Sequence, residues 1–96
     1  MGDLVTVQCA VGSGDLPLNI TWKLNGKNID LTSDVNFQKQ GKRVSILTID
    51  SVNAYHAGLY TCIATNVAGN FSHSAELIVN GLFNNLKSIF QLLLLV

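Results

Sequence analysis

Two cysteines and two histidines carry the most versatile side-chain chemistry in this chain of 96 residues. Cys9 and Cys62 are more than fifty residues apart, whereas redox-active pairs favour close spacing such as Cys-x-x-Cys and an exposed, electropositive setting. A zinc site needs about four ligands, and the cysteines together with His56 and His73 show no ligand spacing. The pattern therefore favours a structural Cys9–Cys62 disulfide, which would contribute about 4 kcal/mol in the chain-entropy model.

Other patterns of catalysis and ligand binding are missing from the sequence. No His, Asp, Ser or Cys group has the spacing of a nucleophile and its base, and no glycine-rich phosphate loop lies between a strand and a helix. Six Lys and Arg balance six Asp and Glu, so the chain has no basic footprint for nucleic acid. The sequence favours a protein-binding role, with no catalytic residue, no metal site, no cofactor and no nucleic-acid partner.

Two glycosylation signals, together with the cysteine pair, indicate an extracellular address. Asn19-Ile20-Thr21 and Asn70-Phe71-Ser72 each have the N-x-S/T pattern. The first residues, Met1-Gly2-Asp3, lack the basic region of a signal peptide. We therefore expect a segment of a larger cell-surface protein, which contacts a membrane only through other parts of that protein.

Apolar and polar residues alternate along most of the chain, which is typical of half-buried strands. Val5, Val7, Cys9 and Val11 form the first such row. Asn25-Gly26 is the strongest two-residue hairpin signal, because both positions tolerate positive φ. Strands are expected over residues 5–11, 20–24, 28–31, 35–39, 44–49, 59–66 and 71–79. Seven short strands at hairpin spacing predict an all-β, antiparallel two-sheet sandwich.

Residues 81–96 (GLFNNLKSIFQLLLLV) differ from this pattern, so we divide the chain into a domain at 1–80 and an apolar tail at 81–96. The tail has apolar residues at helical spacing, namely Leu82, Leu86, Ile89 or Phe90, and Leu93. A spanning helix needs ~20 apolar residues, and the final apolar run is far shorter. A short helix at a membrane interface is one interpretation; a non-native or truncated end is the one that the sequence favours.

Trp22 and Tyr60 stand at informative distances from the two cysteines. Trp22 follows Cys9 by thirteen residues, inside the next expected strand, where its ring can pack against the disulfide. Tyr60 precedes Cys62 by two residues, which is the spacing of a tyrosine corner. With residues 47–52 (LTIDSV) and 58–62 (GLYTC), these positions resemble an I-set immunoglobulin domain with Greek-key topology over about residues 3–79.

Longer segments resemble a narrower group of immunoglobulin domains. Residues 14–22 (GDLPLNITW), 60–66 (YTCIATN) and 74–80 (SAELIVN) are similar to variable-type domains of the arthropod Down syndrome cell adhesion molecule (Dscam) family. The narrower resemblance depends on the first segment, because the other two recur across many adhesion molecules. It implies homophilic cell–cell recognition, as in neuronal adhesion and axon guidance, by an extracellular domain of a plasma-membrane protein.

The sequence departs from the family pattern at two places. Most immunoglobulin domains have Asp two residues before the glycine of the GLYTC segment, where it pairs with a basic residue, but this chain has His56. We therefore expect a weakened or absent ion pair and a hydrogen-bonded turn histidine. The chain also leads directly into the first expected strand, so we expect strand A to be missing. Its absence is expected to expose backbone groups at a sheet edge.

Specificity must lie on residues that face away from the core. A low-charge, β-branched surface avoids self-repulsion when the same patch meets itself in a two-fold contact, and glycans on Asn19 and Asn70 would cover parts of the other sheet. The candidate interface therefore lies on the sheet that carries Cys9: Thr6, Gln8, Gln38, Val44, Ile46 and Thr48. The outward residues of the second sheet are Lys23, Thr61, Ile63, Glu76 and Ile78.

Three other interpretations remain open at this point. Strand propensity alone would also explain β-branched residues on an outer face. The domain could bind a different protein, as immune or axonal receptors do. An intracellular, muscle-type I-set spacer is the remaining alternative, and a protected disulfide with occupied glycosylation sites would exclude it.

Overall fold

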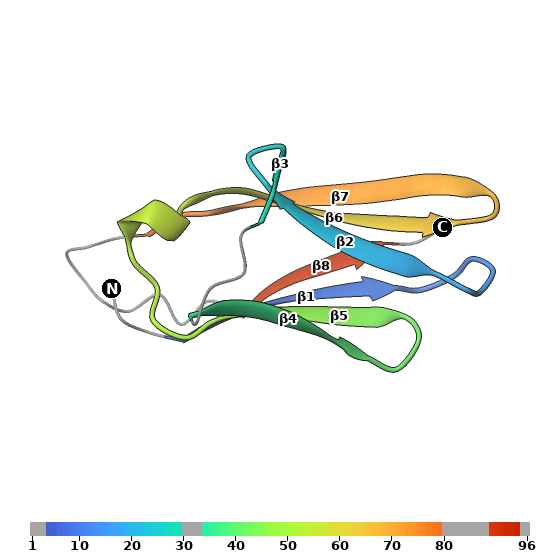
Figure 1. Cartoon of the computed structure of the whole chain (residues 1–96), viewed down its shortest axis with the longest axis horizontal. Coiled ribbons are helices and arrows are strands. Elements are labelled where there is room, and N and C mark those ends of the chain that lie inside the picture. The colour runs from blue at the N-terminus through green and yellow to red at the C-terminus, as the bar shows by residue number, and fades with distance from the viewer. Residues whose placement is uncertain (1–3, 30–33, 80–88, 95–96) are drawn as a thin grey trace.

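The computed structural model describes residues 4–29, 34–79 and 89–94, the last of these as backbone only. Figure 1 shows two layers of strands, with the short 3₁₀ helix η1 (Ala54–His56) at one end. The strands are β1 (Val5–Val11), β2 (Asn19–Leu24), β3 (Lys27–Asn28), β4 (Val35–Gln40), β5 (Val44–Ile49), β6 (Gly58–Asn66), β7 (Gly69–Leu77) and β8 (Ile89–Leu94).

The two layers are four-stranded sheets with the orders β4-β5-β1-β8 and β3-β2-β6-β7. All neighbouring strands are antiparallel except β1 and β8. The chain passes from one sheet to the other after β1, after β3, after β5 and after β7, as in a Greek-key sandwich. This arrangement confirms the predicted immunoglobulin-like sandwich.

Turn chemistry sets where the hairpins begin. Asn25 and Gly26 have φ of 52° and 80°, so β3 starts directly after them and pairs with the end of β2. The strand predicted over 28–31 therefore begins one residue earlier, and its last two residues lie outside the described part of the chain. β7 begins at Gly69, two residues before the prediction, because Asn66 pairs with Gly69 across a two-residue turn.

The core lies between the sheets and follows the alternation along each strand. In β1, four inward residues are buried and the three between them are half-buried. Burying one such aliphatic side chain contributes about 1.5–3 kcal/mol relative to leaving it exposed. The buried apolar set is Val5, Val7, Cys9, Val11, Leu18, Ile20, Trp22, Val35, Leu47, Ile49, Val52, Tyr60, Cys62, Ala64 and Leu77.

A disulfide and a neighbouring hydrogen bond join the two sheets. Cys9 and Cys62 are bonded, with their Cα atoms 6.4 Å apart. Trp22 pairs with Cys62 across β2 and β6, and Ser45 pairs with Cys9 across β5 and β1. The indole Nε1 of Trp22 donates a hydrogen bond to the Ser45 hydroxyl at 2.9 Å, fully inside the core. Ser45 thus satisfies the one polar atom of the buried tryptophan.

Tyr60 closes the end of the sandwich, as the tyrosine-corner spacing predicts. Its hydroxyl donates a hydrogen bond of 2.6 Å to the backbone carbonyl of His56 in η1. The side chain is buried, and this burial raises the pKa of Tyr60 to about 12. The corner therefore depends on a neutral phenol.

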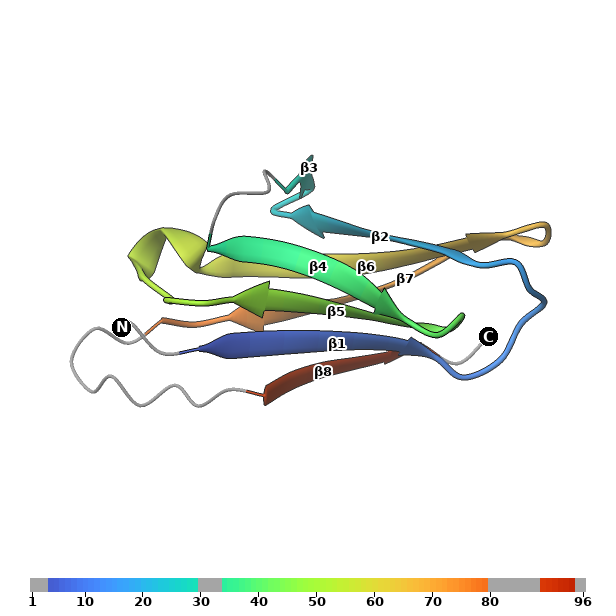
Figure 2. The same ribbon diagram turned by 60° about the horizontal axis from the view of Figure 1, so that its bottom comes forward.

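The tail corrects two predictions. Helical spacing over residues 82–93 predicts a helix, but Ile89–Leu94 form strand β8, which pairs with β1 in parallel from Thr6–Ile89 to Val11–Leu94. The side of β1 away from β5 supplies hydrogen-bond partners for the backbone of this segment. For the same reason, the prediction of an exposed sheet edge beside β1 is wrong: Figure 2 shows β8 lying there.

Leu82 and Leu86, which belong to the predicted helical row, lie outside the described residues. Within the described ranges, no helix is long and apolar enough to cross a membrane.

Candidate interaction surface

Strand register brings the six predicted interface residues into one patch, which we call the β1–β5–β4 face: Thr6, Gln8, Gln38, Val44, Ile46 and Thr48. Ile46 lies at its centre, because it pairs with Gln8 on one side and with Gln38 on the other. Thr6 pairs with Thr48 in the next row of this face. Gln38 is exposed and the other five residues are half-buried.

The chemistry of the β1–β5–β4 face is amide, hydroxyl and β-branched aliphatic, without a charged group among its six members. Val44 lies beside Ala10 and Gln40 in its own row, so the rows around the centre are small or uncharged. Such a surface can pack against a copy of itself without like-charge repulsion. The sequence predicted these side chains to face outward, and the structure confirms that placement.

The outer face of the second sheet carries both candidate glycosylation sites. Asn19 pairs with Thr65 across β2 and β6, and Thr65 pairs with Asn70 across β6 and β7. The three residues therefore form one row on one face, with the two asparagines two strand spacings, about 10 Å, apart. The Thr65 hydroxyl donates a hydrogen bond of 2.8 Å to Oδ1 of Asn70. Glycans at these positions would cover the second sheet, not the β1–β5–β4 face.

The remaining outward residues of the second sheet form a more polar surface. Lys23 pairs with Thr61, whose hydroxyl lies 2.7 Å from that of Ser74. Glu76 and Ile78 are exposed at the far end of the sheet. This surface contains both signs of charge and hydroxyl groups that already bond to one another.

His56 is a buried turn residue, as expected from its position. The Nδ1 of His56 accepts a hydrogen bond of 2.9 Å from the backbone N–H of Asn53, and the backbone N–H of His56 donates to the carbonyl of Asn53. Its Nε2 lies 3.4 Å from Oδ2 of Asp34, close enough for an ion pair but without a hydrogen-bond partner. The basic residue, His56, therefore lies in η1, and the acidic residue, Asp34, lies just before β4. In the family pattern the acidic residue stands at the position of His56, so the two charges are exchanged.

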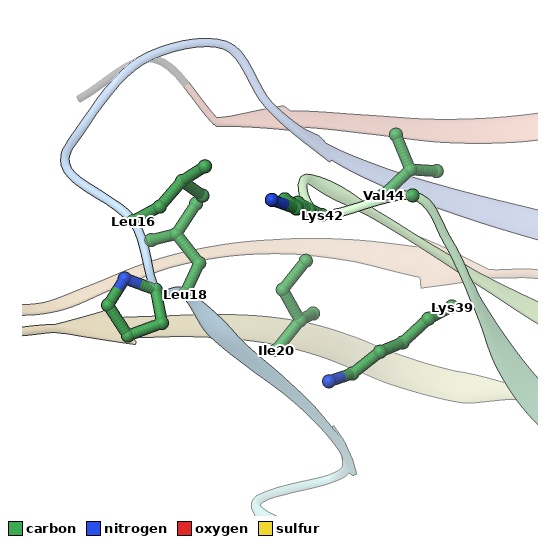
Figure 3. A pocket seen from close by; sticks show the side chains of 8 residues that line it. Leu16, Leu18, Ile20, Lys39, Lys42 and Val44 are labelled. Atoms are coloured by element: carbon green, nitrogen blue, oxygen red, sulfur yellow. The ribbon is translucent and has the colours of Figure 1, made fainter.

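A hollow of about 460 Å³ opens where the loop between β1 and β2 faces the turn between β4 and β5. Leu16, Leu18 and Ile20 line one side, and Val44, a member of the β1–β5–β4 face, lines the other (Figure 3). Arg43 ties the two walls together: its Nη2 donates to the Gly14 carbonyl at 2.7 Å, and its own carbonyl accepts from the N–H of Val11 at 2.9 Å.

Sequence reasoning missed this hollow and the role of Ser45. Position parity in the strand at 44–49 could have placed Ser45 inward with Leu47 and Ile49, opposite the buried tryptophan. The hollow has a weaker signal, because its walls come from segments nineteen or more positions apart, and the sequence does not show that these segments lie together.

The sequence model of the immunoglobulin domain matches residues 1–66. The chain belongs to the immunoglobulin domain family. Over 81 residues it is 47% identical to the cell adhesion molecule Dscam1 of Drosophila melanogaster, which covers 83% of this chain and 4% of that protein. It is 42% identical over 79 residues to the cell adhesion molecule DSCAML1 of Homo sapiens, again covering 82% of this chain and 4% of the relative. The chain thus spans a small part of these relatives' length.

Solved structures give the same relationship. The crystal structure of the Dscam1 Ig7 domain, isoform 9, superposes with a TM-score of 0.76 at 47% identity, covering 81% of this chain and 82% of that one. An I-band fragment of titin superposes with a TM-score of 0.71 at 34% identity, covering 80% of this chain and 26% of the fragment. The resemblance to Dscam immunoglobulin domains is confirmed, and the related proteins are cell adhesion molecules by name.

Proposed function

We propose that this immunoglobulin domain is an extracellular adhesion module of a cell-surface protein, and that it binds a second copy of itself through the β1–β5–β4 face. The observation that carries the proposal is that the outer faces of the two sheets differ in chemistry. One sheet presents an uncharged patch centred on Ile46, and the other holds Asn19 and Asn70 in a single row. A homophilic contact needs one free, self-complementary surface, and this arrangement leaves one.

The relatives support a role in adhesion rather than catalysis. Dscam1 and DSCAML1 are named cell adhesion molecules, and both cysteines of this chain form a disulfide in the core. In a two-fold contact, Ile46 would face its counterpart or a neighbour in the same patch, with Gln8 and Gln38 able to hydrogen-bond at the rim. We expect the parent protein at the plasma membrane, with this domain outside the cell and without catalytic activity.

Sedimentation of the purified domain over a range of concentrations tests the proposal. We expect reversible dimerisation that Ile46→Asp abolishes, because two carboxylates would be buried near the two-fold axis. Ile63→Asp, the matched change on the other sheet, should leave dimerisation intact, and both variants should keep their cooperative unfolding. Loss of the dimer in Ile63→Asp alone would place the contact on the second sheet and contradict the proposal. A monomer at every concentration would favour a different protein as the partner.

The titin similarity supports one other candidate, a spacer with a mechanical role. Mass spectrometry of the protein expressed in a secretory host separates the two. An intact Cys9–Cys62 bond with glycans on Asn19 and Asn70 supports the extracellular function, whereas a reduced, unglycosylated native protein would support the spacer.

A further inference from the structure

The hollow between the β1–β2 loop and the β4–β5 turn combines aliphatic walls with two cations. Lys39, near the end of β4, and Lys42, in the following turn, line it together with Leu16, Leu18, Ile20 and Val44. Figure 3 shows both amino groups directed across the hollow toward the leucine side. Among the described residues that line the hollow, none carries a carboxylate. The ammonium groups of two exposed lysines thus flank the aliphatic wall, and no described lining residue carries a negative charge.

Lysines on an edge strand have a simpler explanation. β4 is the terminal strand of its sheet, and an edge lysine discourages the addition of a foreign strand. This explains Lys39, and it makes an extended peptide a poor occupant for the hollow. It does not explain Lys42, which lies in the turn, or the aliphatic wall that faces both amino groups.

The walls of the hollow are formed before any ligand arrives. Arg43 joins the β4–β5 turn to the β1–β2 loop through its bond to the Gly14 carbonyl, and the N–H of Val11 bonds to the Arg43 carbonyl. Leu18 and Ile20 are buried members of the core, so their side chains are fixed by packing. Asn19, between them, is exposed on the opposite side of the strand, and a glycan there would leave the hollow open.

We propose that this hollow binds a free aliphatic carboxylate of medium chain length, with its chain against Leu16, Leu18 and Ile20 and its carboxylate between Lys39 and Lys42. The volume of about 460 Å³ falls within the range of about 300–1,000 Å³ that small-molecule sites occupy. An apolar chain matches the walls, and one negative charge matches the paired ammonium groups. The hollow shares Val44 with the homophilic face proposed above, but the five residues assigned to hold the ligand, Leu16, Leu18, Ile20, Lys39 and Lys42, lie outside that face.

Amide NMR shifts of the whole chain, titrated with sodium octanoate, nonanoate and decanoate below their micellar concentrations, test the proposal. We expect saturable shifts confined to residues 16–20 and 39–44. Affinity should rise about fourfold for each added methylene group, as aliphatic burial implies. Lys39→Gln and Lys42→Gln should each weaken decanoate binding by about three- to fivefold, and added salt should weaken it in the wild type.

Matched variants distinguish the binding of the carboxylate from the binding of the aliphatic chain. Lys27→Gln, an exposed lysine on β3, should leave decanoate affinity unchanged. Leu16→Ser, at a position that is 43% exposed, should weaken binding without changing the salt dependence, and thermal unfolding of each variant checks that it is folded.

Several results would overturn the proposal. Equal binding of decanol would show that the lysines do not recognise the ligand. Co-sedimentation with phosphatidylserine vesicles, without binding of free decanoate, would assign the hollow to a membrane surface. Shifts of residues 16–20 and 39–44 that depend on protein concentration alone would show that a second copy covers it.

Discussion

The hydrogen bond between Trp22 and Ser45 lies inside the core, beside the disulfide, where water cannot replace either partner. Ser45→Ala would leave the indole N–H buried without an acceptor. An unsatisfied buried donor costs about 1–3 kcal/mol, more than the roughly 1 kcal/mol net value of a hydrogen bond in which both partners can return to water. For a domain of this size, that loss should lower the Tm by about 4–24 °C.

A double-mutant cycle with Trp22→Phe isolates this cause from general damage to the core. In the Phe background there is no indole N–H to leave unpaired, so Ser45→Ala should be nearly neutral or slightly stabilising. Unfolding by urea, followed by far-UV circular dichroism, gives the four free energies, and the expected coupling is about 1–2 kcal/mol. Ser74→Ala, which removes an exposed serine, serves as the control and should cost little.

Either of two results would contradict a stabilising hydrogen bond between Trp22 and Ser45. Ser45→Ala could cost less than about 0.3 kcal/mol, or it could cost the same with Trp22 and with Phe at that position. Both would mean that the hydrogen bond does not stabilise the packing of the two sheets, and that the serine is a small residue that fits a tight space.

Three further predictions follow from other parts of the fold. Burial raises the pKa of Tyr60 to about 12, above its unfolded value of about 10, so its contribution to stability should be complete below pH 10 and decline as the pH rises toward 12; Tyr60→Phe should remove this decline in urea midpoints. His56→Asp should destabilise the domain by placing a carboxylate near Asp34, and adding Asp34→Arg should restore the loss, whereas no recovery in the double variant would contradict an electrostatic link. Gln91→Pro should loosen β8 and speed hydrogen exchange along β1 with little change in β6; unchanged exchange would mean that β8 does not protect that edge.

Period-two alternation was enough to predict the sandwich, because each inward row is specified locally and a one-residue slip would expose it. The inward and outward sides of β1 and β5 were therefore correct, including the outward side of Ile46, which follows from parity alone. The register that sets Ile46 between Gln8 and Gln38 needed the structure, because it depends on strands separated along the chain.

The tail shows where local patterns are insufficient. The spacing over residues 82–93 fits a helix, and the short apolar run within it fits a strand equally well, so periodicity alone cannot decide between the two. The deciding interaction is non-local: β1 has an edge that β5 does not cover, and Ile89–Leu94 pair with it. His56 was recognisable as a turn residue from its motif, but its approach to Asp34 depends on a contact across twenty-two positions that no local pattern encodes.

The row formed by Asn19, Thr65 and Asn70 has a consequence for how two molecules meet. Carbohydrate on both asparagines would block a partner from approaching the outer face of the second sheet, since bulky, hydrated chains would occupy that space. The productive collisions would then be a restricted set of orientations, and partners that need the shielded side would be rejected before any contact forms. Selectivity in such a domain would come as much from forbidden approaches as from attraction at the uncovered surface.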